Sequence, residues 1–156
     1  MTLREARADE AALLSALALR SKAVWGYSRE FMEACRDELT YAAEEIAQGG
    51  FVVAEEDGGI VGFYALERCA PGEVELDALF VEPGAIGRGV GRALIEDAKI
   101  RAARIGARRM TIQGDPHAEP FYAAAGAVVC GSRPSGSIPG RALPLFVIEL
   151  VRNQPA

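Results

Sequence analysis

Several features that mark other protein classes are missing from this sequence. It has three cysteines, an odd number, and none forms a C-x-x-C pair, which argues against a disulfide framework and against a zinc site. No apolar run approaches the roughly 18 residues of a membrane-spanning helix. The N-terminal stretch, MTLREARADE, lacks the apolar core of a signal peptide. Together these absences predict a cytoplasmic protein with reduced thiols and no membrane segment.

Charge is present but unevenly distributed. Residues 1–87 contain 7 basic and 17 acidic side chains, whereas residues 88–109 contain 7 basic and 2 acidic ones. The basic stretch is either a solvated helix face or a site for a compact polyanion. Nucleic acid is disfavoured as a partner, because the chain is acidic overall and its aromatic residues do not interleave with the basic run.

The order of hydrophobic patterns predicts one mixed α/β domain that fills residues 1–156. We expect strands in the ranges 2–7, 51–69 (two strands), 72–83, 108–113, 127–132 and 142–151. We expect helices in the ranges 8–25, 28–50, about 90–105 and 118–126. The predicted order is therefore β–α–α–β–β–β–α–β–α–β–β.

Local signals place the ends and faces of these elements. Asp9 and Ser28 are candidate N-caps of the first two helices, and Asp57-Gly58-Gly59 predicts a hairpin turn. Apolar stripes at helical spacing predict the buried faces of the second and third helices, namely Phe31, Cys35, Leu39, Ala42 and Ile46 in one and Val90, Leu94, Ala98 and Ile105 in the other.

The segment VEPGAIGRGVGRALIEDAK, residues 81–99, joins a strand to a helix and contains glycines at 84, 87, 89 and 91. One glycine would satisfy a tight turn, whereas Gly87, Gly89 and Gly91 at alternate positions exceed that need. Backbone N–H groups at a helix N-terminus bind anions, and Arg88 and Arg92 add positive charge. A phosphate-bearing ligand is the natural occupant. The lysine of a P-loop and the glycine spacing of a dinucleotide fold are both missing.

Two carboxylates stand out in the strand that precedes these glycines. Residues two apart in a strand share a face, so Glu75 and Asp77 are expected to point the same way from an otherwise apolar run. Such a pair costs stability unless it is solvated, paired with an arginine or used in chemistry. Mutual repulsion and partial burial would raise at least one pKa toward the range of a general base.

The glycine stretch resembles the signature Q/R-x-x-G-x-G/A of the GNAT superfamily of acyl-CoA-dependent N-acetyltransferases. The segment Ile86-Gly87-Arg88-Gly89-Val90-Gly91 matches it at all but the first position, where Ile86 replaces Gln or Arg. ALFVEP is similar to the strand before the signature, and DPHAEPFYAAAGA is similar to the C-terminal N-x-x-A-x-x-[FL]-Y-x-x-x-G-[FA] block. The resemblance covers nearly the whole chain and implies the GNAT fold with a splayed central sheet.

The resemblance also implies a cofactor site. Acetyl-CoA would lie in the splay of the sheet, with its diphosphate on the amides of residues 87–92 and its pantetheine arm along the backbone of the preceding strand. The residues implicated are Leu79, Phe80, Val81, Gly87, Arg88, Gly89, Val90, Gly91 and Arg92. Asp115 stands where the family has an Asn that contacts the cofactor arm. No metal is implied.

Catalytic roles come from the same resemblance. Glu75 lies where some family members have a glutamate base, with Asp77 as the other candidate, and Tyr122 matches a tyrosine beside the CoA sulfur that can act as general acid. Read without the family, Tyr122 could be an amphipathic core residue and Asp115 a helix cap. The single histidine, His117, has no neighbouring Ser or Cys, which favours a supporting position over a catalytic one.

Two segments are candidates for binding the acceptor. RSKAVWGYS holds Trp25 and Tyr27, which either stack on a substrate or join the first two helices. SGSIPGRALPLF carries Arg141, and this loop either covers an active site or forms the edge of a homodimer.

The sequence therefore predicts an N-acetyltransferase that moves the acetyl group of acetyl-CoA to a small primary amine by direct attack in a ternary complex. A non-catalytic CoA-binding or regulatory domain on the same fold is the first alternative, and a protein that binds ATP or NAD is the second. The acidic first half of the chain mildly favours a cationic acceptor.

Overall fold

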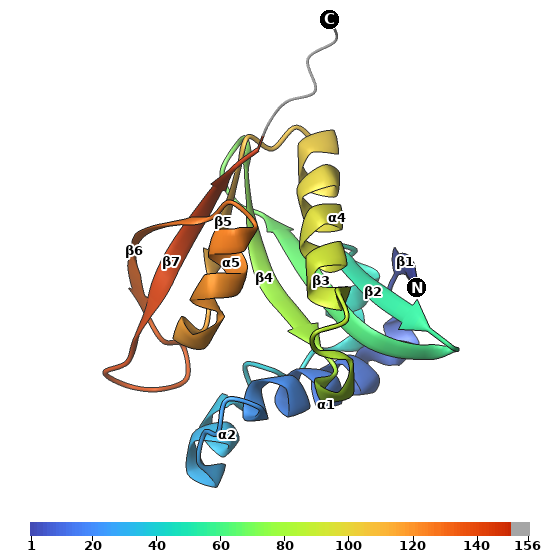
Figure 1. Ribbon diagram of the computed structural model, residues 1–156, viewed down its shortest axis with the longest axis vertical. Coiled ribbons are helices and arrows are strands. Elements are labelled where there is room, and N and C mark those ends of the chain that lie inside the picture. Colours follow the sequence, from blue (N-terminus) through green and yellow to red (C-terminus); the bar gives the residue numbers. More distant parts are fainter. Residues whose placement is uncertain (151–156) are drawn as a thin grey trace, which may run out of the picture.

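Within residues 1–150, which the computed structural model describes, seven strands form one mixed sheet (Figure 1). The strands are β1 (Thr2–Glu5), β2 (Phe51–Glu56), β3 (Gly59–Arg68), β4 (Glu73–Val81), β5 (Arg109–Gln113), β6 (Val128–Pro134) and β7 (Ala142–Glu149). They lie in the order β1-β2-β3-β4-β5-β7-β6. Each neighbouring pair is antiparallel except β4 and β5, which are parallel. The predicted mixed α/β class is confirmed, and so is the element order, except that two helices, α2 and α3, stand where one was expected.

Helices cover both faces of the sheet. They are α1 (Ala11–Ala23), α2 (Arg29–Cys35), α3 (Ala43–Ala47), α4 (Val90–Arg104) and α5 (Glu119–Ala124), with short 3-10 turns η1 (Ala8–Glu10), η2 (Pro83–Ala85) and η3 (Pro116–Ala118). One hydrophobic cluster joins α4 and α5 to side chains such as Tyr64 and Met110. The other joins α1, α2 and α3 to Phe63 and Ala78 on the opposite face. Alternate residues of the central strands thus feed two separate cores.

The helix predicted over 28–50 is wrong in its middle. Ser28 does cap α2 by accepting a hydrogen bond from the Phe31 N–H at 3.1 Å, but α2 ends at Cys35 and α3 begins only at Ala43. Between them the Tyr41 N–H donates to Ser15 Oγ at 2.9 Å, a bond that a continuous helix would not allow. The Tyr41 ring also packs edge-on against two phenylalanines of the sheet. Tertiary contacts therefore override helix propensity here.

Two smaller expectations about helices are also wrong. Asp9 does not cap the first helix but lies within η1, and the carboxylate of Glu10 accepts the Arg7 N–H instead, at 2.8 Å. Ile105 follows the end of α4 and is 45% exposed, whereas Ala102 is fully buried. Ala102 lies four residues after Ala98, so it continues the buried stripe.

The hairpin at Asp57-Gly58 is confirmed. Both residues have positive φ, +52° and +80°, and the strand pair closes at Glu56 and Gly59. Positive φ at both central residues is the geometry of a two-residue turn that matches the twist of its strands.

The sheet opens between its two parallel strands. β4 pairs with β5 only from Glu73 to Leu76, and β4 then continues to Val81 without a strand on that side. In Figure 1 the lower half of β4 diverges from β5. The expected splay of the central sheet is therefore present.

The described residues end just after β7. The last predicted strand extends to Val151, which lies outside them. No helix in residues 1–150 has the length and apolar character needed to cross a membrane.

Candidate functional site

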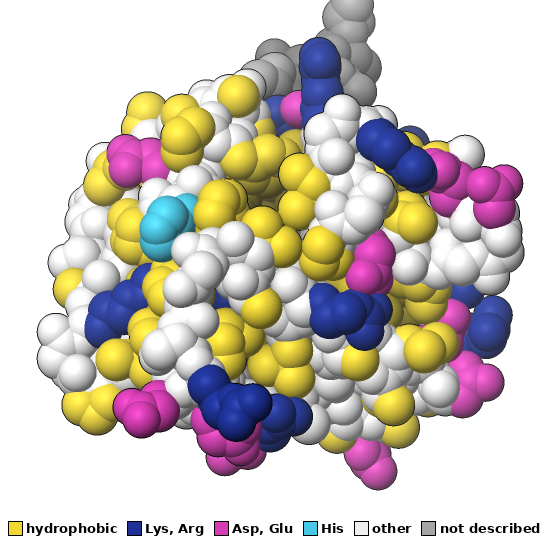
Figure 2. All heavy atoms as spheres, turned by 60° about the horizontal axis from the view of Figure 1, so that its bottom comes forward, with side chains coloured by type: hydrophobic (Ala, Val, Ile, Leu, Met, Phe, Trp, Pro, Cys, Tyr) yellow, Lys and Arg dark blue, Asp and Glu magenta, His cyan; other side chains and the backbone are white. Residues whose placement is uncertain are grey.

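A cavity of about 780 Å³ opens where β4 separates from β5. Its walls come from the end of α1, the segment between α1 and β2, the strand β4, the glycine turn (residues 86–91), α5 and the β6–β7 loop (residues 135–141). Figure 2 looks onto this end of the molecule, where hydrophobic side chains gather around a recess. All predicted site residues except Arg88 and Tyr27 line the cavity.

The glycine turn leads from β4 into α4 through a left-handed backbone. Gly87 and Gly89 both have a φ of +84°, a conformation that costs other residues about 1–2 kcal/mol. The dihedral angles of Ile86, φ −63° and ψ 140°, and the positive φ of Gly87 are those favoured at the two central positions of a type II turn. The first helical bond of α4 runs from the Ala93 N–H to the Gly89 carbonyl, so the N–H groups before it have no helical acceptor.

Gly91 serves packing rather than turn geometry. A Cβ at this position would lie 3.1 Å from the ring of Phe121 and 3.5 Å from Val81, so its absence lets α4 approach α5. Each of the three alternating glycines therefore has a structural reason of its own. The case for a bound anion rests instead on the free N–H groups and on the partial positive charge at the start of α4.

The side chains of the glycine turn contribute unequally. Arg88 forms an ion pair with Glu56 and does not line the cavity. Arg92 does line it and has no ion-pair partner within residues 1–150. Ile86, at the position of the family's Gln or Arg, is 54% exposed. Arg92 is thus the cation of this segment that is available to an anion in the cavity.

Asp77 forms a bulge in β4. Leu76 pairs with Leu66 of β3 and Ala78 pairs with Ala65, so Asp77 has no partner across the ladder. The extra residue reverses the alternation of side chains: Leu76 joins the cluster under α4, and Ala78 joins the cluster under α1. The bulge lies where β5 ends, and it places the carboxylates of both Glu75 and Asp77 on the cavity wall.

The two carboxylates have different surroundings. Glu75 accepts an ion-paired hydrogen bond from Arg133 at 2.9 Å. Asp77 is reached by solvent within the cavity, but partial burial by the walls, a hydrogen bond with Glu67 and the charges of Glu67 and Glu75 raise its pKa to about 7. Asp77 can therefore gain and lose a proton near neutral pH.

Tyr122 is buried in the wall opposite β4. It is 6% exposed, and its ring packs against Phe121 and Phe146. A Cβ at Gly114 would lie 2.9 Å from this ring, so that glycine makes room for it. The Tyr122 hydroxyl makes no hydrogen bond with another described residue, and burial together with the charge of Asp115 raises its pKa. Tyr122 therefore presents a neutral, unengaged proton donor.

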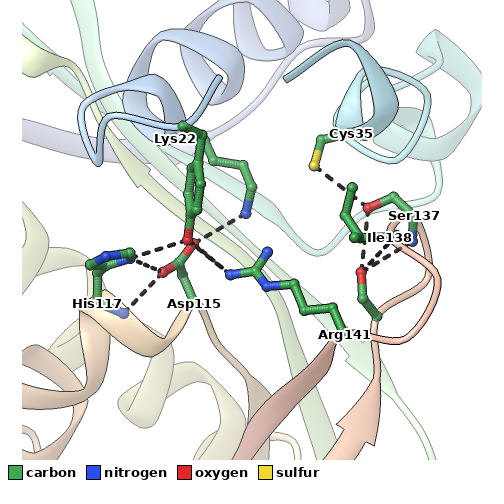
Figure 3. Close-up of polar contacts among 9 residues, drawn as sticks. Lys22, Cys35, Asp115, His117, Ser137, Ile138 and Arg141 are labelled. Carbon is green, nitrogen blue, oxygen red and sulfur yellow. Dashed lines mark hydrogen bonds and ion pairs between the residues drawn. The ribbon is translucent and has the colours of Figure 1, made fainter. Parts of the chain in front are cut away.

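Asp115 is the centre of a polar network that we call the Asp115 cluster: Lys22, Tyr27, Asp115, His117 and Arg141 (Figure 3). Its Oδ2 accepts a hydrogen bond from the Tyr27 hydroxyl at 2.6 Å and lies 3.3 Å from Lys22 Nζ and 3.8 Å from Arg141 Nη2. Its Oδ1 accepts from the His117 N–H at 2.9 Å. The cluster thus ties the end of α1 to η3 and to the β6–β7 loop.

The partners of Asp115 hold it in its charged form. Burial would raise the pKa of Asp115, but hydrogen bonds from Tyr27 and His117 and the charge of Lys22 outweigh this and lower it to about 2. The same carboxylate caps η3, which was the alternative role for Asp115 without the family resemblance. Both of its oxygens are engaged with the protein.

The residues predicted to bind an acceptor are largely held by the protein itself. Trp25 stacks on His117 with ring centroids 5.1 Å apart, and Tyr27 stacks on Phe31 at 4.0 Å. Arg141 donates to the Tyr27 hydroxyl at 2.8 Å, and its guanidinium lies 4.8 Å from the centre of the Phe31 ring. Trp25 and Arg141 line the cavity. Tyr27 does not line it, but its hydroxyl bonds to Asp115 and Arg141, which do. His117 also lines the cavity, and its Nδ1 lies 2.8 Å from Asp115 Oδ1.

Sequence reasoning missed several cavity residues, namely Lys22, Glu38, Tyr41 and Glu45. Lys22 lies in the segment that was singled out for Trp25 and Tyr27. The other three lie in the range predicted as one continuous helix. Only the break between α2 and α3 brings them to the cavity, and no local pattern predicts that break.

Within residues 1–150 no group of three or more His, Cys, Asp and Glu side chains is arranged to hold a metal ion. The groups that line the cavity include the carboxylates of β4, the phenols of Tyr41 and Tyr122, the cations Lys22, Arg92 and Arg141, and backbone N–H groups at the start of α4.

Comparisons with known proteins agree with this geometry. Residues 8–135 match the family model described as an acetyltransferase (GNAT) domain. An uncharacterized N-acetyltransferase of Mycobacterium tuberculosis is 36% identical over 85 residues. That match covers 53% of this chain and 54% of the relative, so it spans only about half the length of each.

Solved structures share the whole fold. A GCN5-related N-acetyltransferase from Rhodopseudomonas palustris superimposes with a TM-score of 0.79 at 27% identity, covering 96% of this chain and 95% of that one. The PaiA N-acetyltransferase from Thermoplasma acidophilum, solved in complex with coenzyme A, superimposes with a TM-score of 0.78 at 21% identity, covering 95% and 98%.

Proposed function

Since this chain belongs to the acetyltransferase (GNAT) family, we propose that it transfers the acetyl group of acetyl-CoA to a primary amine, by direct attack within a ternary complex. The observation that carries the proposal is the placement of Asp77 and Tyr122 on the walls of one cavity that starts at the N-terminus of α4. Similar folds support the cofactor, because the PaiA enzyme was solved with coenzyme A.

The residues present fit acetyl-CoA. The unpaired edge of β4 from Asp77 to Val81 offers backbone groups to an extended amide-containing arm, with Leu79 and Phe80 along it. The free N–H groups at the start of α4, and Arg92, suit a diphosphate. Asp115 differs from the family's Asn, and the network around it leaves it a structural role instead of a contact to the cofactor.

Bound acetyl-CoA supplies the acetyl group as an activated thioester. The amine nitrogen must lose a proton as it bonds to the acetyl carbon, and an Asp77 oxygen receives that proton. Breaking of the carbon–sulfur bond leaves a thiolate, and the Tyr122 hydroxyl donates its proton there. Asp77 suits its role because its pKa is raised to about 7, so it is substantially deprotonated at neutral pH and still basic.

Asp77 is a better candidate for the base than Glu75. One oxygen of Glu75 is engaged by the Arg133 guanidinium, whereas Asp77 has no ion-pair partner within residues 1–150. Glu75 supplies negative charge next to Asp77 and so contributes to the raised pKa of Asp77. In this arrangement Glu75 and Arg133 set the position and basicity of Asp77.

Titration calorimetry with acetyl-CoA tests the cofactor site. We expect micromolar binding in the wild type, strong weakening in Gly89→Asp and near-normal binding in Gly89→Asn. Asp and Asn both tolerate the left-handed backbone at this position, so the pair isolates the effect of negative charge. Preference for ATP or NAD over acetyl-CoA would contradict the proposal.

Catalysis is tested by release of free thiol with a panel of amines. We expect turnover only when acetyl-CoA and an amine are both present, and no acetyl adduct on the protein when the amine is omitted. A protein that binds acetyl-CoA but acetylates no amine, with Asp77→Asn and Tyr122→Phe making no difference, would be the non-catalytic CoA-binding domain instead.

A further inference from the structure

The acceptor side of the cavity is strongly acidic. Glu38 and Glu45, from the segment around the α2–α3 break, line the cavity together with Glu75 and Asp77 of β4. Glu67 of β3 lies beside them, since it pairs across the ladder with Glu75, and its charge contributes to the raised pKa of Asp77. We call these five residues the carboxylate wall.

Little positive charge within the protein balances this wall. Among residues 1–150, Arg133 is the one cation within ion-pair distance of any of the five, and it contacts Glu75. Glu45 uses one oxygen to accept the Ala42 N–H at the start of α3. The other nearby cations, Lys22 and Arg141, are engaged in the Asp115 cluster. The wall therefore keeps a net negative charge that a bound cation would neutralise.

Tyr41 lines the cavity together with Glu38 and Glu45, the two carboxylates that do not come from the sheet. Burial, and then the charges of Asp77, Glu38 and Glu45, raise the pKa of Tyr41, and all four residues line the same cavity. An aromatic ring among carboxylates is a favourable site for an ammonium group, which gains both charge pairing and cation–π attraction.

Near Glu38, the cavity is bounded by α2 on one side and by the β6–β7 loop on the other. Cys35 Sγ lies 3.5 Å from Ser137 Oγ, which brings α2 against the β6–β7 loop (Figure 3). A Cβ built on Gly136 would lie 3.6 Å from Glu38 Oε1, so the loop also borders the wall. At this end the cavity is therefore bounded by the segment from α2 to α3 on one side and by the β6–β7 loop on the other.

Resting on the function proposed above, we propose that the acceptor is a small aliphatic diamine or polyamine. Its reacting amine lies at Asp77, and a second, charged ammonium group lies at Glu38 and Glu45 beside the Tyr41 ring. The second charge explains why the wall extends beyond the two carboxylates that the transfer step itself can use.

Three acceptors of equal chain length test this proposal: α,ω-diaminopentane, pentylamine and ω-aminopentanoate. They place a cation, a methyl group and an anion at the distal end of the same reacting amine. We expect kcat/KM to fall in that order, by about tenfold from the diamine to pentylamine, the effect of two ammonium–carboxylate contacts. The difference should lie in KM and should shrink as salt is added.

A double variant, Glu38→Gln with Glu45→Gln, locates the distal site. Gln at 45 can still accept the Ala42 N–H, so α3 keeps its cap. We expect the preference for the diamine over pentylamine to fall about tenfold, to near unity. The matched control, Glu33→Gln with Glu44→Gln, removes two exposed glutamates from the same segments that do not line the cavity, and it should keep the preference.

Equal kcat/KM for diaminopentane and pentylamine, or a preference that survives the double variant, would overturn the proposal and leave the acetyltransferase function intact. A lysine-rich peptide that outperforms the diamine would overturn it too, in favour of a protein acceptor. Acetyl-CoA binding without acetylation of any of these amines would instead refute the proposed function itself.

Discussion

Asp77 and Asp115 line the same cavity and have opposite electrostatic environments. Asp115 is surrounded by donors and cations: hydrogen bonds from Tyr27 and His117 and the charge of Lys22 lower its pKa to about 2, and Arg141 lies 3.8 Å away. Asp77 has acidic neighbours, Glu67 and Glu75, and partial burial, which raise its pKa to about 7. The aspartate with many partners is fixed as an anion, and the aspartate without them can exchange a proton.

This difference separates structure from chemistry within one site. Ionised Asp115 stabilises the folded state, because its charge is better accommodated in the fold than in the unfolded chain. Ionised Asp77 does the reverse, since its raised pKa means that the fold disfavours its charge. A side chain held at such a cost is a candidate for function.

The largest expected effect is on catalysis by Asp77→Asn. Without a proton acceptor at this position, kcat/KM should fall by about 10³-fold, within the range for a positioned general base. In the wild type the rate should rise with pH through about 7, because the deprotonated carboxylate is the active form, and this limb should be missing from the variant. Steady-state assays across pH measure both.

Asp37→Asn, a change at an exposed aspartate of the α2–α3 segment, is the matched control and should behave as wild type. Asp77→Asn should also unfold at higher urea concentration than wild type at about pH 8, since it removes a charge that the fold disfavours. An unchanged pH profile in Asp77→Asn would mean that another residue is the general base, and Glu75 would be the next candidate to test.

A smaller loss of activity is expected from Tyr122→Phe. Loss of the hydroxyl removes the proton donor for the departing thiolate, and kcat should fall by about 10²-fold, at the low end for a general acid. The ring packing is kept, so acetyl-CoA should bind as in wild type by calorimetry. Tyr64→Phe, at a buried tyrosine bonded to Asp97, is the control for loss of a hydroxyl outside the cavity. Near-normal kcat in Tyr122→Phe would remove the tyrosine from the mechanism.

The third effect is on stability, through Asp115→Asn. Removing this charge leaves Lys22 and Arg141 without their shared carboxylate, and the free energy of unfolding should fall by about 2 kcal/mol near neutral pH. In the wild type the contribution of Asp115 is present above its unfolded pKa of 3.8 and is lost as pH falls toward about 2. Urea denaturation along this range should show a shallower acid limb in the variant. Equal unfolding curves at neutral pH would mean that the Asp115 cluster adds no net stability.

The smallest effect is a shift in pH dependence by Arg133→Met. Its ion pair with Glu75 is partly exposed, so stability should change by less than about 1 kcal/mol. Loss of the guanidinium leaves more negative charge near Asp77, so the rising limb of the pH–rate profile should move to higher pH by a fraction of a unit. Arg36→Met, which breaks an exposed pair with Glu33, should leave the limb in place. A shift of the rising limb to lower pH would contradict this electrostatic explanation.

Much of the fold could be predicted from local sequence. The alternation in β2 and β3, the Asp57-Gly58 turn and the apolar stripe of α4 all depend on residues close in the chain, and each was found where expected except at Ile105, the last residue of the stripe. The prediction of one continuous helix over residues 28–50 was wrong between α2 and α3. There the helical spacing of Cys35, Leu39 and Ile46 is real, and all three are buried, but contacts of Tyr41 with Ser15 and the sheet break the helix.

By itself, the sequence determined the family, the strand–turn–helix unit with its glycines and the presence of carboxylates and a tyrosine near it, because these depend on short-range patterns. The tertiary structure decided what each residue does. It paired Arg88 with Glu56, surrounded Asp115 with partners from two distant segments, and set Asp77 in a bulge beside other acids. A pKa depends on which charges and donors fold against a group, and those neighbours lie far away in the chain.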